Sequence, residues 1–358
     1  NEKSTKPIGF TNHPSPILSE KDDSIIYEMH IRDFTIDESS GVINDLRGTY
    51  LGAVEENTIY KNPYNGKYVK TGIEHLCELG ITHVHLMPIF DFGSVDERFP
   101  GSNNRNWGYD PKNFNVPEGS YCSNPYNPVT RILELRQMIM KFHERGIRVV
   151  MDMVYNHMMS TVNMDNIVPG YYFRSDYLGR YTNGSGCGNE LASERPMVRK
   201  FIIDSCLHWI KDYKIDGIRF DLMELLDIDT TKEIVKKTTK LDKNFLIYGE
   251  PWKGGSSPLV NGTYKGSQKN ENFSIFNDTF RDAIRGNNHP SSGFINGNQY
   301  SSICNWSIIE GLKGSIYTIT SNPNESINYV DAHDNYTLWD QVEKSQNQSI
   351  KFGEFRFS

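Results

Sequence analysis

"DGIRFDLMELLD" (Asp216–Asp227) places an arginine and an aspartate two positions apart within a short apolar strand. Side chains at positions i and i+2 of an extended chain point to the same side, so Arg219 and Asp221 should lie next to each other. Burying a guanidinium and a carboxylate is costly unless the two groups are paired and hydrogen-bonded. Taken alone, the pair is as compatible with a structural ion pair as with a functional site.

Similar apolar runs recur along the chain. Strands are predicted at 24–34, 81–90, 147–157, 215–222, 245–250, 273–278 and 326–333, and helical patterns at 68–80, 130–146, 197–213, 230–241 and 278–286. Alternating strands and helices imply a parallel sheet, and near-continuous apolar strands such as "RVVMDMV" imply a sheet covered on both faces. We therefore expect an α/β fold, a (β/α)8 TIM barrel that is incomplete at its C-terminal end, because no eighth strand is evident.

The expected domain organisation is an N-terminal segment or linker at 1–23 and a catalytic barrel at 24–358. Two insertions rich in Gly, Asn, Pro and Tyr, at 91–128 and 158–195, follow the second and third strands. Long loops after strands are where barrel enzymes build substrate sites. Too few residues follow the seventh strand for the remaining helices and strand, so we expect a truncated chain that is poorly stable and weakly active by itself.

Composition excludes several classes of protein. The net charge is −7 with no Lys/Arg stripe, which argues against nucleic acid as a partner. No apolar run approaches the ~20 residues that span a bilayer. The N-terminal residues show no signal-peptide pattern. The five cysteines are too scattered for a disulfide framework or a CxxC metal site. Free thiols slightly favour a cytoplasmic over a secreted location, and we leave the location unassigned.

Polar and charged residues gather where the predicted strands end. The third strand ends in Asp152, Asn156 and His157, the fourth in Arg219 and Asp221, the fifth in Glu250, and the seventh in His333 and Asp334. In a barrel these side chains converge on one mouth, where the chemistry of this fold takes place. Two carboxylates flanking a glycosidic bond, one ionised and one protonated, are the minimal equipment for glycoside hydrolysis.

Four stretches resemble the ordered regions of the α-amylase superfamily of retaining glycosidases: "VVMDMVYNH", "DGIRFDL", "YGEPW" and "YVDAHDN". Three more, "NWGYDP" (Asn106–Pro111), "IIYEMHIRDF" and "GNELASERPMVRKFI" (Gly188–Ile203), are similar to those of type I pullulanases, the debranching enzymes of that superfamily. The resemblance covers residues 24–340. Any one of these short motifs would be weak alone, and their combination is specific.

The resemblance implies a role for each candidate residue. Asp221 is similar to the nucleophile that forms a covalent glycosyl intermediate, Glu250 to the general acid/base and Asp334 to the third catalytic carboxylate. The expected substrate-binding side comprises Tyr109, Asp152, Asn156, His157, Arg219, His333, Trp107 and Trp252. Within it, Arg219 would keep the nucleophile ionised, Asp152 and Asn156 would support the third strand end, and Tyr109 would stack beneath the sugar.

The implied substrate is a branched α-glucan such as pullulan, amylopectin or a glycogen-derived dextrin, cleaved at its α-1,6 bonds. Two departures from the type I pattern affect the subsites rather than the bond-breaking residues: Arg105 stands where a tyrosine is usual, and Glu224 where a glycine is usual. The alternatives are an α-1,4-acting neopullulanase or amylase, and a catalytically silent glucan-binding fragment.

A metal hydrolase is a rival interpretation, because His83 and His85 have the i, i+2 spacing of barrel metal ligands. A histidine pair on a buried strand is more often engaged in packing and hydrogen bonding. No cofactor is required by the proposed chemistry. Calcium is a candidate in the Asn- and Asp-rich insertions, but no EF-type loop occurs there and we assign no metal.

Overall fold

The computed structural model describes residues 5–99, 106–289 and 291–351. The chain divides into two compact units, which are described separately. The first comprises Asn1–Ile247 and Trp252–Thr263, and the second comprises Tyr248–Pro251 and Tyr264–Ser358. Seven parallel strands follow one another in the order β1-β4-β7-β8-β9-β10-β11, which is also their order along the chain. This confirms the parallel sheet of an incomplete (β/α)8 barrel, and among the described residues no eighth strand joins it.

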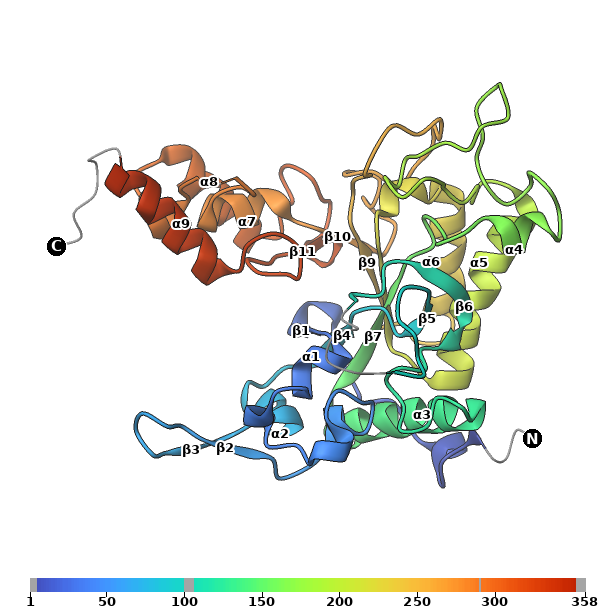
Figure 1. Cartoon of the computed structure of the whole chain (residues 1–358). Helices are drawn as coiled ribbons and strands as arrows, with labels where there is room; N and C mark the ends of the chain where they lie inside the picture. Colours follow the sequence, from blue (N-terminus) through green and yellow to red (C-terminus); the bar gives the residue numbers. More distant parts are fainter. Residues whose placement is uncertain (1–4, 100–105, 290, 352–358) are drawn as a thin grey trace. The chain divides into compact units, whose positions relative to one another are not determined.

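Most strands in the sheet of the first unit are buried on both faces. Its strands are β1 (Ile26–Met29), β4 (His83–Leu86), β7 (Arg148–Met153), β8 (Gly217–Phe220) and the start of β9 (Leu246–Gly249) (Figure 1). Every residue of the last four is buried, which explains why these strands read as continuous apolar runs.

Four long helices of the first unit accompany these strands: α2 (Gly72–Glu78), α3 (Pro128–Glu144), α5 (Pro196–His208) and α6 (Ile228–Thr239). Asn127 accepts a hydrogen bond from the backbone of Val129 and so caps α3, while Asp227 caps α6 through the backbone of Thr230. Helices α5 and α6 pack side by side (Figure 1). A π-helical turn, Trp209–Tyr213, ends α5.

Two predicted elements of the first unit differ in extent. The strand expected at 24–34 ends at Met29, and Ile31–Thr35 form the short helix α1, because Nδ1 of His30 accepts from the backbone of Asp33. The helix expected at 68–80 begins only with α2, since Tyr68–Lys70 form β3 and pair with β2 (Ile59–Lys61).

The first insertion adds a separate two-stranded sheet, β5 (Phe90–Phe92) with β6 (Pro111–Pro117), and the second carries α4 (Val162–Asp165). Short 3₁₀ helices occur at Phe10–Asn12, Lys21–Asp23, Glu38–Ser40, Asn44–Leu46, Gly52–Val54, Met223–Leu225, Phe294–Asn296 and Pro323–Glu325.

The second unit contains the end of β9, β10 (Ser274–Phe276) and β11 (Ser326–Ile327), with α7 (Asp278–Arg285), α8 (Ser302–Leu312) and α9 (Leu338–Lys351). Helices α7 and α8 touch at Gly311, where a Cβ would lie 2.1 Å from the Phe280 ring. The strand expected at 326–333 is only two residues long. The domain boundary expected at residue 23 stays a prediction. Among the described residues, no helix is both long and apolar enough to cross a membrane.

Candidate active site

Asp221 follows the last residue of β8, and both of its carboxylate oxygens are held. Oδ1 accepts from Nη1 of Arg219 at 3.0 Å, and Oδ2 accepts from Nδ2 of Asn156 at 2.7 Å. Its backbone N–H donates to the carbonyl of Met153, which fixes this residue to the end of β7. The side chain is 14% exposed, so the carboxylate is oriented by the protein and remains reachable from solvent.

Arg219 is shared between two carboxylates. Parallel pairing of β7 and β8 sets Asp152 opposite Arg219, and Nη1 lies 2.9 Å from each oxygen of Asp152. Asp152 also accepts from the Tyr109 hydroxyl at 2.7 Å and lies 3.3 Å from Nε2 of His85. Although burial opposes its ionisation, Arg219 and these hydrogen bonds lower the pKa of Asp152 to about 2.

The proposed nucleophile is in a different electrostatic position. Burial raises the pKa of Asp221 above its usual range, Arg219 opposes that rise, and the like charge of Asp152 adds to it. The two carboxylates therefore compete for one guanidinium, and Asp152 makes the larger number of hydrogen bonds. The buried ion pair and the candidate site thus consist of the same residues.

His157 and Asn156 extend the cluster beyond β7. Nδ1 of His157 lies 2.5 Å from Oδ1 of Asn156, and Nε2 lies 3.0 Å from the carbonyl oxygen of Tyr109. Burial lowers the pKa of His157 to about 4, so the imidazole is neutral at neutral pH. These contacts connect Tyr109, from the first insertion, to the ends of β7 and β8.

Two aromatic residues of the predicted site differ in exposure. Trp107 is 39% exposed and is therefore not a core residue, and Trp252 is half-buried. An open hollow of about 490 Å³ is lined by Ser94, Asn106, Trp107, Tyr109 and Asp110. Tyr109 thus has its hydroxyl on Asp152 and also borders a space that a sugar ring could fill.

Three expected site residues belong to the second unit. Glu250 directly follows β9 and is 4% exposed. Asp334 lies in the loop after β11 and is exposed, with Oδ1 3.7 Å from Nε2 of His333. The structure therefore brings six predicted residues of the first unit into one network, namely Tyr109, Asp152, Asn156, His157, Arg219 and Asp221.

Comparisons with known proteins identify relatives of this chain. The sequence-family model described as the α-amylase catalytic domain matches residues 67–168 of this chain. A curated pullulanase of Bacillus subtilis (strain 168) is 42% identical over 352 residues, which cover 95% of this chain and 46% of that protein. The solved pullulanase of Bacillus acidopullulyticus superposes with a TM-score of 0.90 at 44% identity, over 97% of this chain and 42% of that chain. The chain belongs to the type I pullulanases.

A pullulanase of Paenibacillus barengoltzii, solved with maltohexaose and α-cyclodextrin, has a TM-score of 0.89 at 41% identity and is covered to 54%. The chain thus spans about half the length of the pullulanases that it matches.

The turn after the proposed pullulanase nucleophile has a strained backbone. Leu222 adopts φ 41° and ψ 53°, the left-handed region that bulky residues rarely occupy. Such a conformation costs about 1–3 kcal/mol and persists only where the surroundings determine it. Here it directs the chain from Asp221 into the 3₁₀ turn Met223–Leu225.

His85 belongs to this network, although the sequence did not place it there; its contacts agree with the packing and hydrogen bonding expected for a histidine on a buried strand. As a possible metal ligand it was paired with His83, but its ring lies between Asp152 at 3.3 Å and Glu28 at 3.6 Å. The signal that could have placed it is strand order, because β4 lies between β1 and β7. His83 instead contacts the Thr82 hydroxyl at 2.8 Å.

Among the described residues, the acidic group with ligand-like spacing is Asp91, Glu97 and Glu118, which contains neither histidine of the rival interpretation. Arg131 forms an ion pair with Glu97, and Glu118 accepts from the backbone of Phe92 and Ser120. Burial raises the pKa of Glu118 to about 7. These protein contacts account for the cluster, and we assign no metal to it.

Of the two departures from the type I pattern, Glu224 is placed and Arg105 lies outside the described residues. The Glu224 carboxylate is 2.9 Å from Nζ of Lys253. Glu224 lies three positions after Asp221, and Lys253 lies three positions after Glu250. We therefore assign this ion pair to the surroundings of the proposed site and not to its chemistry.

Proposed function

We propose that the protein is a retaining glycoside hydrolase that cleaves α-1,6-glucosidic bonds of branched α-glucans. The observation that carries this proposal is Asp221, whose two oxygens are held by Arg219 and Asn156 at the C-terminal end of β8. Carboxylates at strand ends of a barrel are where this fold performs catalysis. The activity of the whole protein is proposed, because the chain covers about half of its pullulanase relatives.

In the proposed reaction, an Asp221 oxygen attacks the anomeric carbon while Glu250 gives its proton to the departing glycosidic oxygen. Glu250 then removes a proton from water, and the water oxygen displaces Asp221 with overall retention. Asp334 would stabilise the oxocarbenium-like transition state. His157, His333 and Tyr109 would contact the sugar, and Trp107 and Trp252 would offer apolar faces to neighbouring rings.

The substrate class follows from the relatives. Solved pullulanases at 41% identity are complexes with maltohexaose and α-cyclodextrin, maltotriose or maltotetraose. A rice protein described as isoamylase 3 is 33% identical over 93% of this chain. Binding sites for linear α-glucan segments in these relatives support a glucan substrate here, and the type I motifs support cleavage at its branch points.

Incubation with pullulan tests the proposal. An α-1,6-acting enzyme releases maltotriose, whereas panose or isopanose as the main product would assign α-1,4 cleavage to the neopullulanase alternative. Binding of pullulan without any product would favour the silent glucan-binding alternative. The first-formed anomer should be α, because two displacements preserve configuration.

The roles of the carboxylates are tested in the same assay. Asp221→Asn and Glu250→Gln should each reduce kcat by several orders of magnitude and leave the fold intact. Asp204→Asn is the matched control, since Asp204 is an exposed α5 residue that pairs with Lys200. Near-normal kcat in either active-site variant would refute its role. A crystal structure should show the Asp221 and Glu250 carboxyl groups about 5–5.5 Å apart.

A further inference from the structure

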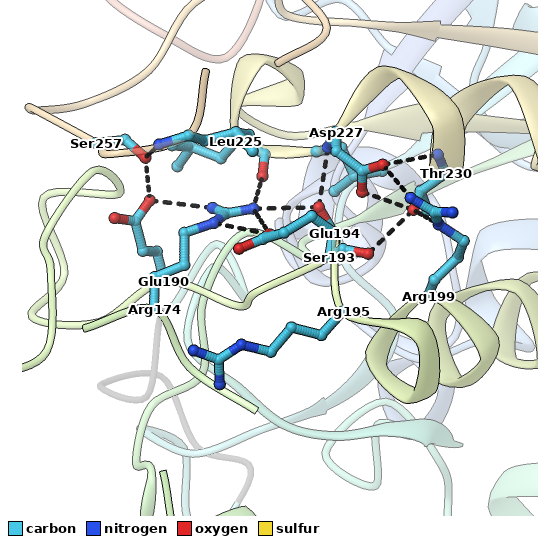
Figure 2. A network of polar contacts seen from close by, with 12 residues as sticks. Arg174, Glu190, Ser193, Glu194, Arg195, Arg199, Leu225, Asp227, Thr230 and Ser257 are labelled. Atoms are coloured by element: carbon cyan, nitrogen blue, oxygen red, sulfur yellow. Dashed lines mark hydrogen bonds and ion pairs between the residues drawn. The ribbon is translucent and has the colours of Figure 1, made fainter. Parts of the chain in front are cut away.

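Arg174, in the insertion at 158–195, lies in a buried polar network of the first unit (Figure 2). Its Nη2 donates to the carbonyl oxygen of Leu225 at 3.0 Å and to Oγ of Ser193 at 3.1 Å. Glu190 lies 3.2 Å from Nη1, and Glu194 lies 2.8 Å from Nη2. One side chain therefore joins the insertion to the turn that follows Asp221.

Glu190 connects this network to a third segment. It is 0% exposed and accepts from the hydroxyl of Ser257 at 2.8 Å (Figure 2). It also accepts from the hydroxyl of Thr182. Ser257 belongs to the segment Trp252–Thr263, which follows Glu250 along the chain and lies in the same unit as Arg174. The ion pair is thus the meeting point of the insertion, the turn after Asp221 and the segment after Glu250.

The other end of the turn is also held by the insertion. Oγ of Ser193 accepts from the backbone N–H of Asp227 at 2.9 Å, and Thr230 donates to the carbonyl of Ser193 at 3.1 Å. Arg199 pairs with Asp227 at 2.7 Å. The stretch from Leu222 to Asp227 is therefore fixed at Leu225 and at Asp227 (Figure 2).

We propose that Arg174, together with Glu190, is a positioning group for Asp221, because it maintains the left-handed turn at Leu222. A strained residue keeps its conformation only while its surroundings determine it, and Leu222 is covalently next to Asp221. Buried ion pairs are often replaceable by apolar residues at no loss of stability, so stability alone does not explain this one. The inference rests on the proposed function of Asp221 as nucleophile.

The first test is Arg174→Met, which keeps an unbranched apolar stem and removes the guanidinium with its five donors. If the turn relaxes, the Asp221 carboxylate is misplaced, and kcat on pullulan should fall by roughly 10- to 100-fold with KM within about twofold. Arg174→Lys should not restore kcat, because an ammonium cannot reproduce the fork of contacts. Arg180→Met is the matched control, since Arg180 is an exposed arginine of the same insertion that pairs with Asp176.

The second test asks whether the turn is the target. Glycine adopts positive φ without strain, so Leu222→Gly in the Arg174→Met background should recover part of the lost kcat. If Arg174 only stabilises the fold, Leu222→Gly can raise the folded fraction by relieving strain, but kcat per folded molecule stays at its wild-type value in both variants. The kcat values are therefore normalised to the folded fraction. A kcat within twofold of the wild type in Arg174→Met, or no recovery in the double variant, would overturn the proposal.

A third measurement does not depend on turnover. Amide hydrogen exchange of Leu225, Leu226 and Asp227 should become faster in Arg174→Met, while the amides of α5 keep their protection. If Arg174→Met does not fold, Ser193→Ala removes the contact to Asp227 and should show the same pattern more weakly. Unchanged exchange in the turn refutes the positioning role. If the wild-type protein does not cleave pullulan, the proposed function is refuted. Faster exchange in Arg174→Met would then still show that Arg174 holds the turn.

Discussion

Among single residues, Asp152 shows how burial and partners separate two neighbouring carboxylates. It is 0% exposed and takes both 2.9 Å contacts from Arg219, together with those from Tyr109 and His85. Asp221 receives one contact from the same guanidinium and one from Asn156. Asp152 therefore anchors the arginine, and the arginine in turn orients Asp221.

Asp152→Asn should accordingly destabilise the protein by about 3 kcal/mol, since Arg219 loses its main buried partner. The folded pKa of Asp152 is lowered to about 2, so its contribution to stability is present above its unfolded pKa and is lost only as pH falls through about 2. Urea unfolding should thus show a constant difference between wild type and variant from about pH 8 to about pH 5. A difference that varies across that range would contradict this account.

Within secondary-structure elements, burial decided what the sequence could predict. Strands β4, β7, β8 and β9 are covered on both faces, and their continuous apolar runs located them. The exposed strand β3 lacks such a run, so its residues read as the start of a helix. The seventh strand is short because the next residues bond elsewhere: Asn328 donates to the Gly311 carbonyl and Tyr329 accepts from Arg281.

The candidate site was predictable to the same extent. Residues at the ends of β7 and β8 could be placed together because parallel strands present their C-terminal ends at one edge. His85 could not be placed from its spacing to His83, since its partners lie on the adjacent strands β1 and β7. The contacts of Arg174 and Glu190 could not be predicted from the sequence either. They join the insertion to Leu225 and Ser257, which are far apart along the chain.

Gly217 tests how closely β8 must approach its neighbours. A Cβ at this position would lie 2.9 Å from Cγ2 of Val150 and 3.0 Å from the backbone oxygen of Leu246. Gly217→Ala should therefore push β8 away from the adjoining strands and destabilise the protein by about 1–3 kcal/mol. Since Arg219 and Asp221 follow on the same strand, kcat should fall as well. Unchanged stability and turnover would show that the sheet can absorb the methyl group.

In the whole molecule, buried ionisable groups couple the fold to pH in opposite directions. Burial lowers the pKa of His83 and of His157 to about 4, from 6.5. Burial raises the pKa of Glu118 from 4.5 to about 7. Each unit difference in pKa between the folded and unfolded states is worth about 1.4 kcal/mol. Where the titration ranges overlap, between about pH 4.5 and pH 6.5, the two histidines therefore contribute more to the pH dependence of the unfolding free energy than the one glutamate.

The sign differs between these groups. Between about pH 4 and pH 6.5 the unfolded chain binds more protons at the histidines than the folded one, so the free energy of unfolding falls as the pH is lowered through this range. For Glu118 the folded state binds the extra proton, so its contribution is present below pH 4.5 and is lost as pH rises through about 7. We expect a net loss of stability on acidification from neutral pH to about pH 4.

Two variants separate the contributions in urea unfolding measured across this range. His83→Asn keeps a partner for the Thr82 hydroxyl and removes one titrating imidazole, so its stability should depend less steeply on pH than that of the wild type. Glu118→Gln removes the opposing group, so its stability should depend more steeply on pH. The slopes of the two variants must therefore lie on opposite sides of the wild-type slope, and a shift of both in the same direction would show that these buried groups do not control the acid stability of the fold.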